Sequence, residues 1–76
     1  PFNPKTMIQF NVPEETVTSL TIFDINGRKV ESLINAKLLS GGHKIEWDAS
    51  SHASGIYFLE LTSGDFRQTK KMVLLK

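Results

Sequence analysis

Cysteine is absent from this 76-residue sequence, and proline (three residues) and tryptophan (one residue) are rare. The lack of cysteine excludes a fold that is cross-linked by disulfides, which many small secreted domains have. No apolar run approaches the roughly 20 residues that a membrane-spanning helix needs. Neither charge sign dominates, because nine Lys and Arg stand against eight Asp and Glu. The strongly basic surface of a nucleic-acid-binding domain is therefore not expected.

The short length limits the size of the core. A chain of this size buries only about 60% of its unfolded surface, which predicts one domain over residues 1–76 with a thin core. Hydrophobic residues make up 39% of the chain, too few to enclose a cleft of the size that enzymes use. We therefore expect no catalysis. Because the chain starts at Pro1 rather than at Met, we also expect it to be a piece of a larger protein.

Apolar residues recur with a period of two, which is typical of β-strands, and no segment has a helical period. The expected strands are residues 6–12, 16–24, 28–34, 43–48, 56–61 and 66–75. The side chains expected to face the core are Ile8, Phe10, Val12, Leu20, Ile22, Val30, Ile45, Trp47, Tyr57, Leu59 and Leu61. Residues 35–39 fit either a short edge strand or an irregular crossing, and Gly41 and Gly42 are expected to end that segment.

The sequence Asn26-Gly27 lies between two of these strands. This pair predicts a type I′ hairpin turn, in which both central residues have positive φ. The segment beginning at Asp24 also resembles the start of a calcium loop, but the Glu required at the twelfth position is replaced by Asn35. The hairpin turn is therefore favoured over a calcium site.

Six or seven short strands, with turn signals about every ten residues, predict an all-β fold. We expect an antiparallel β-sandwich of the immunoglobulin-like or fibronectin III-like class. Antibody domains carry two cysteines around a central tryptophan, and here Trp47 alone is present. The fold would thus share the architecture without the disulfide.

Few residues could take part in catalysis or metal binding. His43 and His52 are the only histidines, and without cysteine partners they do not predict a metal site. The loop that contains His52 also holds the members of a hypothetical triad, but without a nucleophile elbow they are explained as loop residues. Those members are Asp48, Ser50, Ser51 and Ser54. Catalytic residues, cofactors and metal ligands are therefore all predicted to be absent.

The candidate recognition segment lies at the C-terminal end of the sequence. It consists of Lys70, Lys71, Met72, Val73, Leu74, Leu75 and Lys76. Four consecutive apolar residues place apolar groups on both faces of a strand, either between two sheets or at a sheet edge. Lysines on an edge strand protect against aggregation, and an extended terminal strand can also be captured by a receptor through strand addition. Both interpretations remain open from the sequence.

Five segments in order carry a family resemblance: residues 1–4, 24–30, 42–48, 53–58 and 69–76. They read P-F-N-P, D-I-N-G-R-K-V, G-H-K-I-E-W-D, A-S-G-I-Y-F and T-K-K-M-V-L-L-K. Together they resemble the C-terminal sorting domains (type A) of the type IX, or Por, secretion system. Similar motifs occur in the immunoglobulin-like domain of flagellar hook-capping proteins.

The resemblance implies a β-sandwich attached to an N-terminal cargo protein. Such domains direct the cargo across the outer membrane through the secretion machinery. A sortase-like peptidase then cleaves the domain, and the cargo is attached to the cell surface or secreted. We expect a monomer. The alternatives are a passive spacer and a carbohydrate-binding module with Trp47, Tyr57 or Phe58 as its platform, although we expect Trp47 to be buried.

Overall fold

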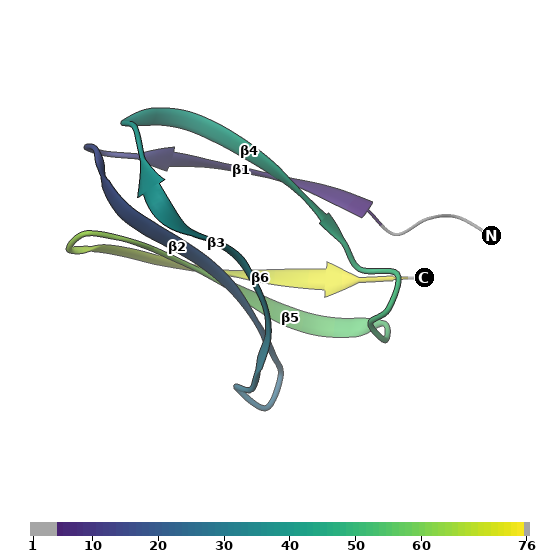
Figure 1. The fold of residues 1–76 in the computed structure, drawn as a ribbon. Coiled ribbons are helices and arrows are strands. Elements are labelled where there is room, and N and C mark those ends of the chain that lie inside the picture. Colours follow the sequence, from purple (N-terminus) through teal and green to yellow (C-terminus); the bar gives the residue numbers. More distant parts are fainter. Residues whose placement is uncertain (1–4, 76) are drawn as a thin grey trace.

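The structure is a computed structural model that describes residues 5–75. It consists of two antiparallel sheets (Figure 1). Six strands occur in this range: β1 (Lys5–Val12), β2 (Thr16–Asp24), β3 (Lys29–Leu38), β4 (Gly41–Asp48), β5 (Gly55–Ser63) and β6 (Phe66–Leu74). No helix in this part of the chain is long and apolar enough to cross a membrane. The predicted all-β class is confirmed.

The sheets differ in size. β1 and β4 pair as a two-stranded sheet, while the other four strands pair in the order β3-β2-β5-β6. The small sheet lies over one face of the large one, as an immunoglobulin-like sandwich requires (Figure 1). β1 and β6 point in opposite directions, so the start of β1 and the end of β6 lie at the same end of the molecule.

The core lies between the sheets. Its buried apolar side chains are Ile8, Val12, Leu20, Ile22, Trp47, Ala49, Tyr57, Leu59 and Leu61. The other predicted core residues, Phe10, Val30 and Ile45, are partly buried against this cluster. The alternation in the sequence therefore identified the inward face of β1, β2, β4 and β5, because successive side chains of a strand point to opposite faces.

The β2–β3 turn differs from the predicted type I′ turn. Gly27 has a φ of +81°, but no non-glycine residue in the described range has a positive φ, so Asn26 does not. The Gly27 amide donates to the Asp24 carbonyl (3.0 Å), and the Asp24 amide donates to the Arg28 carbonyl (2.9 Å). This pattern is a three-residue hairpin loop in which a tight turn is followed by one left-handed glycine. The type I′ prediction was wrong, although the hairpin itself is present.

β3 is longer and less regular than predicted. It begins at Lys29 and runs to Leu38, so the segment left open in the sequence continues this edge strand. Its pairing with β2 skips Val30 and Leu33, each of which forms a bulge. Gly41 and Gly42 do not end this segment as expected, since they begin β4 and pair with the end of β1.

Candidate functional site

The predicted recognition segment lies in β6, at the edge of the large sheet. β6 pairs with β5 along its whole length, and no described strand pairs with its other edge. Residues 70–74 belong to this strand, Leu75 follows it, and Lys76 lies outside the described residues. The sequence left open whether this strand is central or at an edge, and the sheet order places it at an edge.

The apolar residues of β6 divide between two faces. Met72 and Leu74 are paired with Tyr57 and Gly55 of β5, and both pack against the core. Val73 points outward and is 60% exposed, and Leu75 is 74% exposed. The expectation that apolar groups point to both faces is thus confirmed. Val73 and Leu75 are therefore exposed, whereas Met72 and Leu74 are half-buried against the core.

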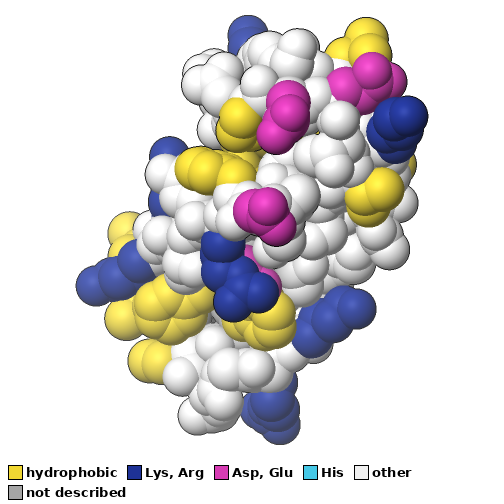
Figure 2. Space-filling view, turned by 90° about the vertical axis from the view of Figure 1, so that its left-hand side faces the viewer, with side chains coloured by type: hydrophobic (Ala, Val, Ile, Leu, Met, Phe, Trp, Pro, Cys, Tyr) yellow, Lys and Arg dark blue, Asp and Glu magenta, His cyan; other side chains and the backbone are white. Residues whose placement is uncertain are grey.

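The cations of β6 have no acidic partner in the described range. Arg67, Lys70 and Lys71 are exposed, and none of them forms an ion pair with a described carboxylate. On the face in Figure 2, Lys and Arg side chains are spread from top to bottom, and the Asp and Glu side chains lie in its upper and middle parts. A nearly neutral chain therefore still has locally uncompensated positive charge.

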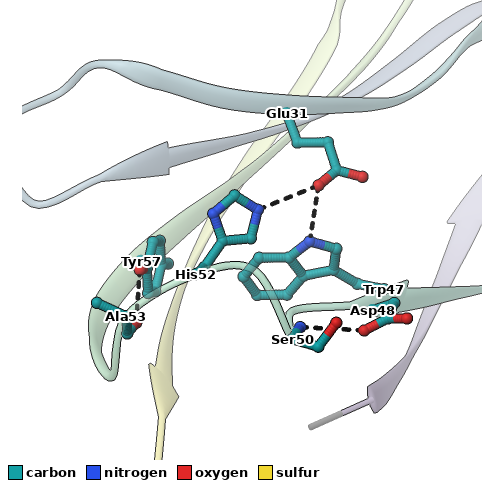
Figure 3. Close-up of polar contacts among 7 residues, drawn as sticks. All are labelled: Glu31, Trp47, Asp48, Ser50, His52, Ala53 and Tyr57. Carbon is teal, nitrogen blue, oxygen red and sulfur yellow. Dashed lines mark hydrogen bonds and ion pairs between the residues drawn. The ribbon is translucent and has the colours of Figure 1, made fainter.

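A polar cluster joins the two sheets at the other side of the sandwich (Figure 3). Trp47 Nε1 donates to Glu31 Oε1 over 3.2 Å, and His52 Nε2 lies 3.3 Å from the same oxygen. The rings of His52 and Tyr57 each lie within 6 Å of the Trp47 ring, with centroid distances of 5.7 and 5.6 Å. Glu31 was missed in the sequence because it lies between two bulges, where side-chain alternation fails.

The loop after β4 is held by local hydrogen bonds. Asp48 Oδ1 accepts a bond from the Ser50 backbone amide (3.0 Å), and the Tyr57 hydroxyl donates to the Ala53 carbonyl (2.7 Å; Figure 3). His52 is oriented by Glu31. These contacts give Asp48, Ser50 and His52 a role in fixing the loop on the sheet.

The two histidines have separate partners. His43 Nε2 lies 2.7 Å from the Leu39 carbonyl oxygen, and the His43 ring stacks on Phe10 with centroids 5.5 Å apart. Across residues 5–75, no group of three or more His, Asp or Glu side chains could hold a metal ion. Each histidine thus has a contact that explains its position.

The aromatic platform of a carbohydrate-binding module is not formed. Trp47 is 1% exposed and Tyr57 is 8% exposed, so neither ring can stack on a sugar. Phe58 lies on the outer face of β5 and is half-buried. The expectation that Trp47 is buried is confirmed, and the platform hypothesis is wrong for Trp47 and Tyr57.

The β2–β3 turn contains a carboxyl group, that of Asp24, whose pKa is shifted by its neighbours. The Arg28 backbone amide, 2.9 Å from Asp24 Oδ1, lowers the pKa of the Asp24 carboxyl below its ordinary value of 3.8. The Asn26 amide and the Arg28 guanidinium, both bonded to Asp24, act in the same direction. This carboxylate caps the hairpin loop, a role that fits a turn and not a metal site.

A protein-family comparison adds an independent finding. The family model for the secretion system C-terminal sorting domain matches residues 1–75. No curated protein and no solved structure matched the chain. The similarity to hook-capping domains is not addressed by this match and stays a prediction.

Proposed function

The chain belongs to the family of secretion system C-terminal sorting domains, and from this membership we propose that β6 is the segment by which the secretion machinery recognises it. A domain of this family is a sorting signal for type IX secretion, and its cargo is exported to the cell surface or the extracellular space. We assign recognition to residues 70–76, which are the recognition segment expected from the sequence.

The position of β6 supports this proposal more than any other observation. An edge strand presents a row of backbone donors and acceptors that a receptor strand can pair with. In β6 this row lies next to outward apolar groups, Val73 and Leu75, and next to cations without acidic partners, Lys70 and Lys71. Backbone pairing would supply affinity, and these side chains would supply specificity.

The remaining parts of the proposal follow from family membership. Residues 1–76 would form one non-catalytic domain of a larger secreted protein, with the cargo on its N-terminal side. A sortase-like peptidase would cleave the chain ahead of Pro1, and the cargo would then be released or attached to the surface. The rival function is a passive spacer, which would leave export independent of β6.

Export of a reporter cargo fused to residues 1–76 tests the proposal. Deletion of residues 70–76 removes core contacts of Met72 and Leu74, so it must be accompanied by point variants that retain the fold. Val73→Glu and Val17→Glu form a matched pair, because both valines are 60% exposed, one on β6 and one on β2. We expect Val73→Glu to reduce export and Val17→Glu to leave it unchanged. Undiminished export after the deletion would reject the proposal and favour the spacer.

A further inference from the structure

The unpaired edge of β6 faces a groove that it shares with β1. β1 pairs only with β4 among the described strands, so it too has an open edge. Residues 6–9 of β1 and 70–72 of β6 line opposite sides of a groove of about 250 Å³, and Leu59 of β5 lies at its base. The two sheets therefore leave one side of the sandwich open.

The groove continues along both strands. A narrower hollow of about 20 Å³ shares Gln9, Leu59 and Lys70 with it and extends to Phe10 and Gln68. Residue numbers rise along β1 as they fall along β6, in agreement with the opposite directions of these strands in Figure 1. Residues 6–10 span about 16 Å in extended conformation, enough to lie beside about five residues of another strand.

The shape and the base of the groove suit an extended segment. Ile8 and Leu59 are each 7% exposed, and Met72 is half-buried, so the base is the edge of the core. The volume is below the roughly 300–1,000 Å³ of small-molecule pockets. A strand placed here would cover this apolar base and would meet unpaired backbone edges.

The charge of the residues along the groove indicates which charge a bound segment should carry. β1 and β6 carry no Asp or Glu, and of their four cations Lys70 and Lys71 line the groove, while Lys5 and Arg67 lie elsewhere on the same strands. Lys5 is the one with a described acidic neighbour, Glu46, at 3.9 Å. Every Asp and Glu residue of the chain lies outside β1 and β6. A segment with Asp or Glu would complement these walls, whereas a basic segment would be repelled.

We infer that the β1–β6 groove binds an extended segment of a partner protein in which acidic and apolar residues alternate, an inference that rests on the proposed function of β6. The apolar side chains of the segment face Ile8, Leu59 and Met72. Its carboxylates, on the other face of the segment, reach Lys71, since Lys70 and Met72 share the face of Leu59. Its backbone pairs with β6 and adds a fifth strand to the large sheet.

Fluorescence anisotropy on the purified 76-residue chain tests this inference. The probe is a short labelled peptide of alternating valine and glutamate, and the control peptide has lysine in place of glutamate. We expect the acidic peptide to bind and to bind more weakly as salt is raised. The lysine peptide should not bind.

Variants of exposed groove residues locate the binding. Lys70→Glu with Lys71→Glu should weaken acidic-peptide binding by about tenfold or more. Met7→Asp on the opposite wall, where the side chain is 55% exposed, should weaken it as well. Lys29→Glu is the matched control, because Lys29 is exposed on β3 at the other edge of the same sheet. It should leave binding unchanged.

Each other outcome overturns the inference. Equal binding of both peptides, or binding insensitive to the β1 and β6 variants, removes the groove as the site. Self-association abolished by Met7→Asp identifies a second copy of the chain as the occupant. Binding of anionic lipid vesicles in place of the peptide identifies a membrane surface.

The export experiment distinguishes failure of the groove inference from failure of the sorting proposal. If Val73→Glu reduces export while no peptide binds, the groove inference fails and the sorting role stands. If the peptide binds while Val73→Glu leaves export unchanged, the role of β6 in export fails.

Discussion

Glu31 accepts a hydrogen bond from the Trp47 indole across the interface between the two sheets. The bond is 3.2 Å long and joins β3 of the large sheet to β4 of the small one. The same carboxylate oxygen lies 3.3 Å from His52 Nε2. One half-exposed side chain therefore fixes the largest core residue and the loop that follows it. The sandwich is closed here by a polar contact and left open at the β1–β6 groove.

Removal of the Glu31 carboxylate should destabilise the fold. Glu31→Ala leaves the indole N–H of Trp47 buried without its acceptor, which costs about 1–3 kcal/mol. Glu31→Gln is the control, because its amide oxygen can still accept the bond. Urea unfolding of the two variants measures the difference. Equal losses for both would show that the hydrogen bond is not the important contact.

The buried hydroxyl groups of Thr18 on β2 and Ser63 on β5 should contribute non-additively to the free energy of unfolding. Thr18 Oγ1 and Ser63 Oγ lie 3.1 Å apart, and both residues are buried. Thr18→Val leaves the Ser63 hydroxyl unpaired and should cost about 1–3 kcal/mol. Adding Ser63→Ala should recover part of this loss, since both polar groups are then gone. Strictly additive effects in a double-mutant cycle would contradict the prediction.

Acid should weaken the β2–β3 hairpin through Asp24. Its carboxyl has a pKa lowered below the ordinary value of 3.8, chiefly by the Arg28 amide. Because the folded state favours the charged form, the stabilisation is present above that value and is lost as pH falls through the folded pKa. Urea unfolding over a pH series measures this loss. In Asp24→Asn the side chain retains an acceptor oxygen but has no charge. Its contribution to the free energy of unfolding should therefore not change over that pH range. An unchanged acid dependence in Asp24→Asn would rule out Asp24 as its source.

Gly27 should be the most sensitive position of the same turn. Its φ of +81° is strained for residues with a Cβ, and an added Cβ would meet nothing within 4 Å. Gly27→Ala should therefore cost about 1–2 kcal/mol through the backbone alone. In a domain of this size that loss lowers Tm by roughly 4–16 °C. Gly27→Asn is the control and should lose less, because Asn adopts this conformation more readily. A larger loss for Asn would contradict the backbone explanation.

Features set by neighbouring residues were predictable from the sequence. The strand pattern and the inward positions of Leu20, Trp47 and Leu59 follow from the two-residue period of a pleated strand. The existence of the β2–β3 hairpin was predictable as well. Its turn type was not, because the Asp24 side chain caps the loop and Gly27 alone takes the left-handed conformation.

The sequence by itself determined an all-β chain with a thin apolar core and a basic, apolar last strand. It also carried the family motifs, since these are local patterns of residues. Only the tertiary structure decided that β6 is an edge strand, that β1 lies across a groove from it, and that Glu31 reaches Trp47. These relationships depend on which strands pair and where bulges shift the register, and both are settled by contacts between residues far apart in the chain.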